Sequence, residues 1–361
     1  MKPLRILIAG GGTGGHLFPG IAVAREVLRR QSDAVVTFAG TARGIESRVI
    51  PREGFPLDVL RSAGIKSTSL QARLRGLSLL PLSGLDAWRI LSRRSPDVVI
   101  GVGGYSSGPV VLAAAARRIP TLLLEQNAVP GLTNRLLARV VSSAAVTFES
   151  TVGFFGGKGF VTGNPVRPEF FDVAPERVAG PPRVLIFGGS QGAHAINVAM
   201  VEAAAGLAAR NLGLEITHQT GERDLELVRD GYRRAGLAAR VEPFLFDMAR
   251  EMKLADLVVC RSGATTIAEL TASSRPAIFI PLPTAADDHQ RVNAEVLVKA
   301  RAAEMIEQRD LTGERLAGRI AAVASDGSAR RAMSDAAHRL AHPDAAAAIV
   351  ERVFELAKRA I

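Results

Sequence analysis

The stretch Ile6-Leu-Ile-Ala-Gly-Gly-Gly-Thr-Gly-Gly-His16 decides the fold, because a similar stretch returns later in the chain. It aligns without a gap with Val184-Leu-Ile-Phe-Gly-Gly-Ser-Gln-Gly-Ala-His194, and the two share Leu, Ile, three Gly and His at matching positions. Each copy is an apolar β run, a glycine-rich turn and the start of a helix. The repeat therefore predicts two Rossmann-like α/β halves rather than one large sheet.

The rest of the chain supports this organisation, because short β-branched runs alternate with helical patterns, as in parallel sheets covered by helices. We expect two Rossmann-like domains that face a central cleft, in residues 1–163 and 164–342, joined through a Pro/Gly-rich segment near 179–182. Residues 343–361 contain a helix that either caps the second domain or returns to the first. The expected strands are Arg5–Ala9, Val35–Ala39, Val98–Val102, Thr121–Glu125, Ala144–Phe148, Arg183–Phe187, Leu214–His218, Leu257–Cys260, Ala277–Ile280 and Ala303–Ile306.

Composition narrows the class of protein. The 361 residues are 47% hydrophobic and 22% charged, as in a globular protein that buries a core, and the single cysteine excludes an internal disulfide. The apolar run at the start ends at Ala9, too early for a secretory signal, so we expect the mature chain to begin here. A net charge of +10 attracts phosphates, nucleic acid or an anionic membrane, but aromatic residues make up only 5% and no nucleic-acid-binding motif is present. We expect no nucleic acid partner.

The uncharged segment 98–116 approaches the length of a membrane span. Its glycines, serines and Pro109 instead predict a strand, a loop and an alanine-rich helix.

The glycines of the first turn let the backbone adopt positive φ and expose N–H groups at a helix start, where an anion is favoured. Phosphate is the expected ligand of this turn. The alternative is that the glycines only allow tight packing, as they do in many α/β proteins. A third glycine-rich loop, Gly101-Val-Gly-Gly-Tyr-Ser-Ser-Gly108, follows another expected strand. A dinucleotide site is disfavoured, because the second strand runs into Gly40-Thr-Ala-Arg-Gly44 without the acidic residue that holds ribose.

The second half offers a better nucleotide site. After the strand Leu257–Cys260, Arg261-Ser-Gly-Ala-Thr-Thr266 opens a helix whose N-terminus suits a diphosphate. Glu269, one turn in, can accept hydrogen bonds from two ribose hydroxyls; the simpler alternative is a solvated helix carboxylate. Asp287-Asp-His-Gln290 is placed for polar contacts to a sugar.

Together these motifs resemble one family, the MurG family of peptidoglycan N-acetylglucosaminyltransferases, over nearly the whole chain. The resemblance rests on the segments Gly10–Gly20, Gly101–Pro109, Glu125-Gln-Asn127, Gly163-Asn-Pro-Val-Arg167, Gly188-Gly-Ser-Gln-Gly192, Cys260–Ala264 with Glu269, and Asp288-His-Gln290. It implies a GT-B glycosyltransferase that moves GlcNAc from UDP-GlcNAc to the undecaprenyl-linked acceptor lipid I, giving lipid II, at the cytoplasmic face of the cell membrane.

The resemblance also implies roles for individual residues. Thr13, Gly14, Gly15 and Asn127 line the donor-sugar side, Arg167 and Ser190 lie near the diphosphate, and the backbone of Leu245 contacts uracil. Ala264, Thr265, Thr266 and Glu269 hold diphosphate and ribose, and Gln290 contacts GlcNAc.

Transfer with inversion needs a base for the acceptor C4 hydroxyl and stabilisation of departing UDP. His16 is the candidate base, with donation to the acceptor diphosphate as its alternative role; Glu125 and Tyr105 are candidates for orienting the acceptor. His194, the repeat counterpart of His16, is interpreted as structural. No Asp-x-Asp occurs in the sequence, so neither a bound metal nor another cofactor is predicted.

A lipid-linked acceptor requires a membrane contact. Between Gly64 and Trp88 the chain combines leucines with Lys66, Arg73 and Arg75, and its first acidic residue is Asp86. This pattern fits an anchor on anionic lipid, or an ordinary loop and core helix. The alternative functions are a UDP-GlcNAc 2-epimerase, which needs no membrane surface, and a nonenzymatic nucleotide- or RNA-binding protein.

Overall fold

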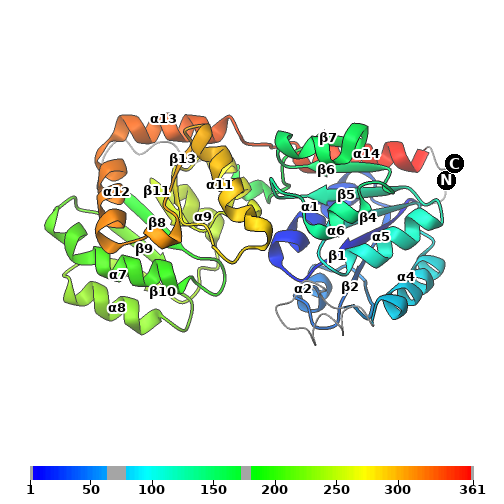
Figure 1. Ribbon diagram of the computed structural model, residues 1–361, viewed down its shortest axis with the longest axis horizontal. Coiled ribbons are helices and arrows are strands. Elements are labelled where there is room, and N and C mark those ends of the chain that lie inside the picture. Colours follow the sequence, from blue (N-terminus) through cyan, green and yellow to red (C-terminus); the bar gives the residue numbers. More distant parts are fainter. Residues whose placement is uncertain (1–2, 63–78, 172–179, 359–361) are drawn as a thin grey trace. The chain divides into compact units, whose positions relative to one another are not determined.

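The computed structural model describes residues 3–62, 79–171 and 180–358. It divides the chain into two compact units: unit 1 is Met1–Val166 with His342–Ile361, and unit 2 is Arg167–Ala341. Each unit contains one sheet, in which every strand pair is parallel, flanked by helices (Figure 1).

The unit boundaries differ from those expected at 163/164 and 342/343. Residues up to Val166 belong to unit 1, and the chain returns to that unit at His342. The chain passes between the units twice, after Val166 and before His342, and the two segments approach each other at Gly163. Gly163 has a φ of +75°, which suits glycine, and a Cβ at this position would overlap the His342 side chain. Both unit boundaries therefore lie within a few residues of this contact between Gly163 and His342.

The sheet of unit 1 has the order β3-β2-β1-β4-β5-β6-β7. The chain order reverses between β1 and β4, and in such sheets ligands bind beyond the carboxyl ends of the strands at that point. The strands are β1 (Arg5–Gly10), β2 (Val35–Gly40), β3 (Leu57–Val59), β4 (Val98–Gly103), β5 (Thr121–Glu125), β6 (Ser143–Val146) and β7 (Gly159–Val161). The helical segments are α1 (Gly14–Arg30), α2 (Glu46–Arg52), α4 (Leu80–Arg94), α5 (Ser107–Ala116), α6 (Leu132–Leu137), η1 (Glu149–Lys158) and α14 (Ala345–Lys358).

Helix α14 packs on unit 1, which decides between the two positions that the sequence leaves open. Ile349, Val350 and Val353 are buried in the same core as β1, β4 and α1. Their spacing places them on one side of the helix, so burying this apolar stripe holds the C-terminal segment against the first sheet.

The sheet of unit 2 has the order β10-β9-β8-β11-β12-β13, with its reversal between β8 and β11. Its strands are β8 (Arg183–Phe187), β9 (Glu215–Gln219), β10 (Ala239–Glu242), β11 (Leu257–Cys260), β12 (Ala277–Phe279) and β13 (Ala303–Met305). The helical segments are η2 (Pro168–Phe170), α7 (His194–Ala209), α8 (Leu225–Arg234), α9 (Met248–Leu254), α10 (Ala264–Ala272), η3 (Ala286–Asp288), α11 (His289–Lys299), η4 (Gln308–Asp310), α12 (Gly313–Ser325) and α13 (Gly327–His338).

All ten expected strands are confirmed, with small shifts at their ends. The sequence did not indicate β3, β7 and β10, which are edge strands of only three or four residues, too short to show an alternating pattern. The segment 98–116 forms β4, a turn and α5, as its glycines predict. Among the helices of the described residues, none has the length and apolar character needed to span a bilayer.

Candidate active site

In unit 1 three polar loops meet at one edge of the sheet. The first glycine turn follows β1, Gly103-Gly-Tyr105 follows β4, and Gln126-Asn127 follows β5. These strands are neighbours and parallel, so their carboxyl ends share an edge. The Gln126 amide nitrogen donates to the Val102 carbonyl at 3.1 Å and ties the third loop to the second.

His16 lies in the first turn of α1, partly exposed, with its Nδ1 at 3.1 Å from the Thr13 hydroxyl oxygen. Its ring packs on Gly103, where an added Cβ would come within 2.7 Å of the imidazole Cδ2. Gly103 has a φ of +95°, so only glycine fits both the backbone and the contact. The structure thereby brings together the first and third glycine-rich loops.

Tyr105 joins the same group of side chains. It is 38% exposed, and its ring lies 3.6 Å from the place a Cβ would take on Gly12. His16 and Tyr105 therefore both border the first glycine turn. An exposed phenol can donate a hydrogen bond to a sugar hydroxyl or accept one from it.

Glu125 has a different environment, because its side chain is buried and its oxygens are used within the protein. The Asn127 amide donates to Oε1 at 3.0 Å; the Gly131 amide and Asn134 Nδ2 donate to Oε2 at 3.0 and 2.8 Å. Burial raises the pKa of this carboxyl and the hydrogen bonds oppose that rise. In this arrangement Glu125 positions the Asn127 loop, rather than offering its oxygens to an acceptor.

Glu46 was missed at the level of sequence and lies beside the first turn. Its side chain is 1% exposed, and it accepts hydrogen bonds from the Gly12 amide at 2.8 Å and from the Thr41 amide and hydroxyl at 2.9 and 2.8 Å. The second strand is thus followed by an acidic residue after all, six residues beyond Gly40. Its carboxylate accepts one amide, that of Gly12, of the turn in which we expected phosphate.

In unit 2 the turn between β11 and α10 is fixed by its neighbours. Arg261 donates to the carbonyls of Ile280 and Pro281 at 2.9 and 3.0 Å and to Gln308 Oε1 at 2.8 Å. The Ser262 hydroxyl donates to the Gln290 carbonyl at 2.8 Å. These bonds attach the start of α10 to the exit of β12 and to α11, so the segments predicted to hold the nucleotide and the sugar are brought together.

Gln290 is partly buried, and its Oε1 accepts the Leu282 amide at 3.0 Å. That bond leaves the two N–H groups of its side-chain amide as the available donors. The first turn of α10 contains Ala264, Thr265 and Thr266, and the positive end of the helix dipole lies there, which favours an anion. Both features suit a sugar phosphate.

Glu269 is one turn further along α10 and partly buried. Burial raises its pKa to about 7, although the positive charge of Arg167 lowers it. This contradicts the solvated-carboxylate alternative. Within the described part of the chain no group donates a hydrogen bond to this carboxylate, so its oxygens can accept hydrogen bonds from a ligand. The Arg167 guanidinium lies over the Phe170 ring, 5.1 Å from its centroid.

The remaining predicted positions of unit 2 lie in two loops. Ser190 is exposed in the turn that follows β8. Leu245 is only 4% exposed, whereas Phe246 beside it is 92% exposed and packs edge-to-face on Phe244 with ring centroids 5.0 Å apart. A backbone contact at Leu245 would therefore be flanked by two aromatic faces.

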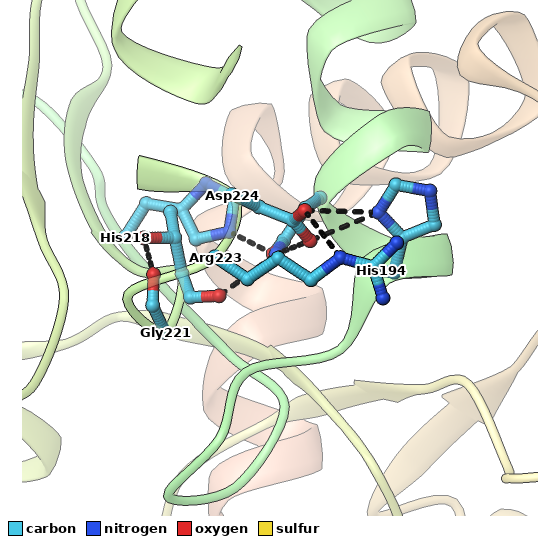
Figure 2. A network of polar contacts seen from close by, with 7 residues as sticks. His194, His218, Gly221, Arg223 and Asp224 are labelled. Carbon is cyan, nitrogen blue, oxygen red and sulfur yellow. Dashed lines mark hydrogen bonds and ion pairs between the residues drawn. The ribbon is translucent and has the colours of Figure 1, made fainter. Parts of the chain in front are cut away.

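His194 ends a chain of polar side chains that reaches the core of unit 2, and Figure 2 shows its imidazole facing Asp224. Asn197 Nδ2 donates to Asp224 and to the Thr220 carbonyl, both at 2.9 Å, so its Oδ1 must accept from Nε2 of His218. The Tyr232 hydroxyl then donates to the other ring nitrogen at 2.7 Å. Burial lowers the pKa of His218 to about 3 and keeps it neutral.

This network supports the structural interpretation of His194. Burial alone would raise the pKa of Asp224, but hydrogen bonds from Asn197 and His194 bring it below its ordinary value. The ionised carboxylate joins α7, β9 and the start of α8. Across the described ranges, no group of three or more His, Cys, Asp or Glu side chains has the arrangement of a metal site.

The comparisons with known proteins agree with this geometry. The Glycosyltransferase family 28 N-terminal domain matches residues 6–146, and the Glycosyltransferase family 28 C-terminal domain matches residues 183–349. The chain is a family 28 glycosyltransferase of the GT-B fold.

Its relatives define a narrower family. The UDP-N-acetylglucosamine--N-acetylmuramyl-(pentapeptide) pyrophosphoryl-undecaprenol N-acetylglucosamine transferase of Anaeromyxobacter sp. (strain K) is 50% identical over 99% of this chain and 94% of its own length. The protein of the same name from Myxococcus xanthus is 47% identical over 98% and 93%. The crystal structure of MurG from Acinetobacter baumannii matches with a TM-score of 0.82 and 32% identity, covering 98% and 100% of the two chains. The chain belongs to the MurG family.

The architecture is shared more widely than the activity. UDP-GlcNAc 2-epimerase from Neisseria meningitidis, solved with UDP-GlcNAc bound, matches with a TM-score of 0.69, 98% and 100% coverage and 14% identity. At that identity the likeness concerns the fold alone.

The raised pKa of Glu269 makes a prediction about stability. The folded chain holds this proton up to a pH of about 7, whereas the unfolded chain releases it near 4.5. Unfolding therefore releases a proton between these values, and the free energy of unfolding falls as pH rises through that window. Glu269→Gln removes this dependence, so the variant should be more stable than the parent at pH 8 by about 1–3 kcal/mol. Denaturant titrations at pH 5 and 8 test it; an equal difference at both pH values contradicts it.

Proposed function

We propose that this chain is an inverting glycosyltransferase that moves GlcNAc from UDP-GlcNAc to the C4 hydroxyl of MurNAc-(pentapeptide)-pyrophosphoryl-undecaprenol, lipid I, to give lipid II for peptidoglycan synthesis. The observation that carries this proposal is the near-complete match to transferases of that name at 50% identity, together with polar residues at the switch point of both sheets. The purified chain, mixed with UDP-GlcNAc and a lipid I analogue, should release UDP and form the disaccharide. UDP-ManNAc as product would instead indicate an epimerase, and binding without turnover a nonenzymatic protein.

Unit 1 supplies the acceptor side of the proposed reaction. The C4 hydroxyl attacks the anomeric carbon and its proton passes to His16, while the bond from that carbon to the UDP oxygen breaks. For Nε2 to take this proton, Nδ1 must carry the hydrogen of the neutral ring, which the Thr13 hydroxyl at 3.1 Å can accept. Tyr105 orients the acceptor sugar, and Glu125 acts through the loop that carries Asn127.

Unit 2 supplies the donor side. We assign the diphosphate to the first turn of α10 with Arg167 and Ser190, the ribose to Glu269, uracil to the backbone of Leu245, and GlcNAc to Gln290. The charge on departing UDP is balanced by the helix N-terminus and Arg167, groups fixed before the reaction begins. This scheme uses no metal ion or cofactor.

The membrane contact is proposed on helix α4. Leu82, Leu85 and Trp88 are 39%, 44% and 50% exposed on one side of it, and the Arg117 guanidinium lies over the Trp88 ring at 4.9 Å. Ala87, Ile90 and Leu91 on the opposite side are buried in the core. One face of the helix therefore belongs to the core, and the other presents an exposed apolar stripe with cations beside it. This second face suits the surface of an anionic bilayer. The basic residues Lys66, Arg73 and Arg75 lie outside the described residues. We propose that the chain acts at the cytoplasmic face of the membrane.

Replacing His16 separates the base from a phosphate ligand. As the base, its removal should lower kcat by about 10²–10⁴-fold with little change in the acceptor KM. His16→Gln keeps a hydrogen-bond donor but no basicity, so it should resemble His16→Ala. Steady-state kinetics with varied acceptor at saturating UDP-GlcNAc test this. Near-parental kcat in His16→Gln would assign the imidazole to diphosphate binding.

Replacing Glu269 tests the ribose site. Glu269→Ala should raise the donor KM by about 10-fold or more, since two ribose hydroxyls lose a charged acceptor worth ~1.5–3 kcal/mol. The parent should bind donor more tightly as pH rises through about 7, because the carboxyl then ionises, and Glu269→Gln should lose that dependence. An unchanged donor KM in Glu269→Ala removes this residue from the site.

The membrane contact is tested with vesicles of phosphatidylglycerol and phosphatidylcholine. Neutralising Lys66, Arg73 and Arg75 together, or replacing Trp88 by Ala, should weaken sedimentation with the vesicles while sparing activity on a soluble acceptor analogue. Leu227→Ala is the matched control, since this leucine of unit 2 is 41% exposed but lies far along the sequence from α4. Equal vesicle binding by parent and variants contradicts the assignment.

A further inference from the structure

The amino-terminal ends of the two sheets carry the same arrangement of residues. Arg5 begins β1 and Arg183 begins β8. Each donates its backbone amide at 2.8 Å to the aspartate that directly precedes the neighbouring strand, which is Asp97 in unit 1 and Asp256 in unit 2. The amide of each aspartate donates in return to the arginine carbonyl at 2.8 Å. The two arginines therefore hold equivalent places in the repeated fold, at the edge of the sheet opposite to the glycine-rich turns.

The units differ in the residue beside this arginine on the next strand. In unit 1 the parallel pairing of β1 and β2 sets Arg5 beside Val35. In unit 2 the pairing of β8 and β9 sets Arg183 beside Glu215, and the arginine Nε donates to that carboxylate at 2.6 Å. Among the described residues no carboxylate forms an ion pair with the Arg5 guanidinium. Unit 1 thus lacks the internal partner that unit 2 supplies.

The Arg5 guanidinium also lacks good hydrogen bonds, although the residue is partly buried. Its Nε is buried and has no hydrogen-bond partner in the described structure, and its Nη1 reaches only the Arg94 carbonyl, at 3.4 Å. That distance is longer than an ordinary N–H···O bond. A buried donor without an acceptor costs free energy unless water or an ion supplies one. This guanidinium is therefore able to take an external acceptor.

A cavity of about 160 Å³ lies against Arg5. Two further arginines, Arg93 and Arg94 at the end of α4, line it together with Val35 and Thr37, and none of the described residues that line it is acidic. One water molecule needs roughly 10–15 Å³ of such space, so the cavity has room for an anion of several heavy atoms.

Arg93 and Arg94 keep donors in reserve after pairing with Asp58. Arg94 gives Nε and Nη2 to that carboxylate at 2.7 and 3.0 Å, and Arg93 gives Nη2 at 2.6 Å. Arg94 Nη1 and Arg93 Nε and Nη1 form no hydrogen bond with the described residues. Asp58 and Asp97 are the two carboxylates bonded to this group of three arginines, which leaves an excess of one positive charge. The excess favours an anion.

The corresponding cavity of unit 2 has balanced charges. It measures about 190 Å³ and is lined by Arg183 and Arg240 together with Glu215 and Glu251. The Arg183 Nε donates to Glu215 at 2.6 Å and the Arg240 Nη1 to Glu251 at 2.8 Å. Each guanidinium therefore has a carboxylate of the protein, and this cavity offers an anion no unpaired charge.

We infer that the cavity at the amino-terminal edge of the unit 1 sheet binds a small oxyanion of the phosphate class, held by Arg5 with Arg93 and Arg94. The anion takes the place that Glu215 fills in unit 2. Its oxygens accept hydrogen bonds from the unpartnered N–H groups of the three guanidinium groups, which suit a phosphate because they are charged and planar. The site lies at the other end of the strands from the candidate active site, and the inference does not rest on the proposed function.

The test titrates inorganic phosphate into the full chain by isothermal titration calorimetry, with UDP at saturation. Arg5→Met keeps the aliphatic stem and removes the guanidinium. Val35→Glu places the carboxylate of unit 2 beside Arg5, at a position that is 43% exposed and has room for it. Both variants should bind phosphate at least 10-fold more weakly than the parent, because a charge-assisted contact is lost. Arg183→Met is the matched control in unit 2 and should bind as the parent does.

Phosphate bound at the glycine-rich turns should be the same in all four proteins, so the difference between parent and variants reports the cavity alone. Thermal unfolding separates a ligand site from simple support of the fold. Phosphate should raise the Tm of the parent above that in chloride of matched ionic strength, and Val35→Glu should fold and lose this rise. If Arg5→Met does not fold, Val35→Glu decides the question.

Glycerol 3-phosphate is the second probe, because free phosphate and the phosphate group of a larger molecule share the same chemistry. Tighter binding of glycerol 3-phosphate than of inorganic phosphate assigns the cavity to a phosphomonoester, and equal or weaker binding assigns it to free phosphate. Absence of a phosphate site in the parent, or equal phosphate affinity in the parent and Val35→Glu, overturns the inference.

Discussion

The whole arrangement depends on one constraint of parallel sheets: each strand must pass its chain to a helix through a turn whose amide groups have no partner in the sheet. Those amides lie at the carboxyl edge, and in a protein interior they need an acceptor. Unit 1 meets the need after β1 with its own Glu46 and after β5 with Glu125. Unit 2 leaves the turn after β8 and the first turn of α10 without such a carboxylate in the described structure. The difference between the halves is therefore a difference in how the same backbone requirement is satisfied.

Four carboxylates near these edges differ in the hydrogen bonds that they accept, and this difference separates residues that support the fold from one that is suited to a ligand. Glu46, Glu125 and Asp224 each accept several hydrogen bonds from nearby loops or helices. Glu269 has none from the described residues, and its pKa rises to about 7 because burial is opposed only by the charge of Arg167. A group kept in that state is costly for the folded chain unless a ligand supplies the missing donors. Two ribose hydroxyls would do so, which is why this residue is assigned to the donor.

The sequence was sufficient for the fold because the information needed is local. Strand and helix periods, and the repeated turn at Ile6 and Val184, are written in consecutive residues. Edge strands such as β10 were not predicted, because the sequence Ala239-Arg-Val-Glu242 has no pattern that distinguishes it from a loop. The candidate site was predicted less completely, since hydrogen-bond partners depend on side chains that are distant along the chain. Glu125 was interpreted as a residue for the acceptor because its burial and its bond to Asn134 are not visible in a motif. Glu46 was missed because a carboxylate after Gly44 has the appearance of an ordinary first residue of a helix.

The position of Glu46 also bears on the two roles open to His16. A histidine that donates to a diphosphate is most useful where neighbouring amides share the negative charge. Here the Gly12 amide is already taken, and the carboxylate that takes it repels a second anion. A hydroxyl group is neutral and meets no such repulsion. The Thr13 hydroxyl, 3.1 Å from Nδ1, can fix the ring orientation that either role of His16 requires.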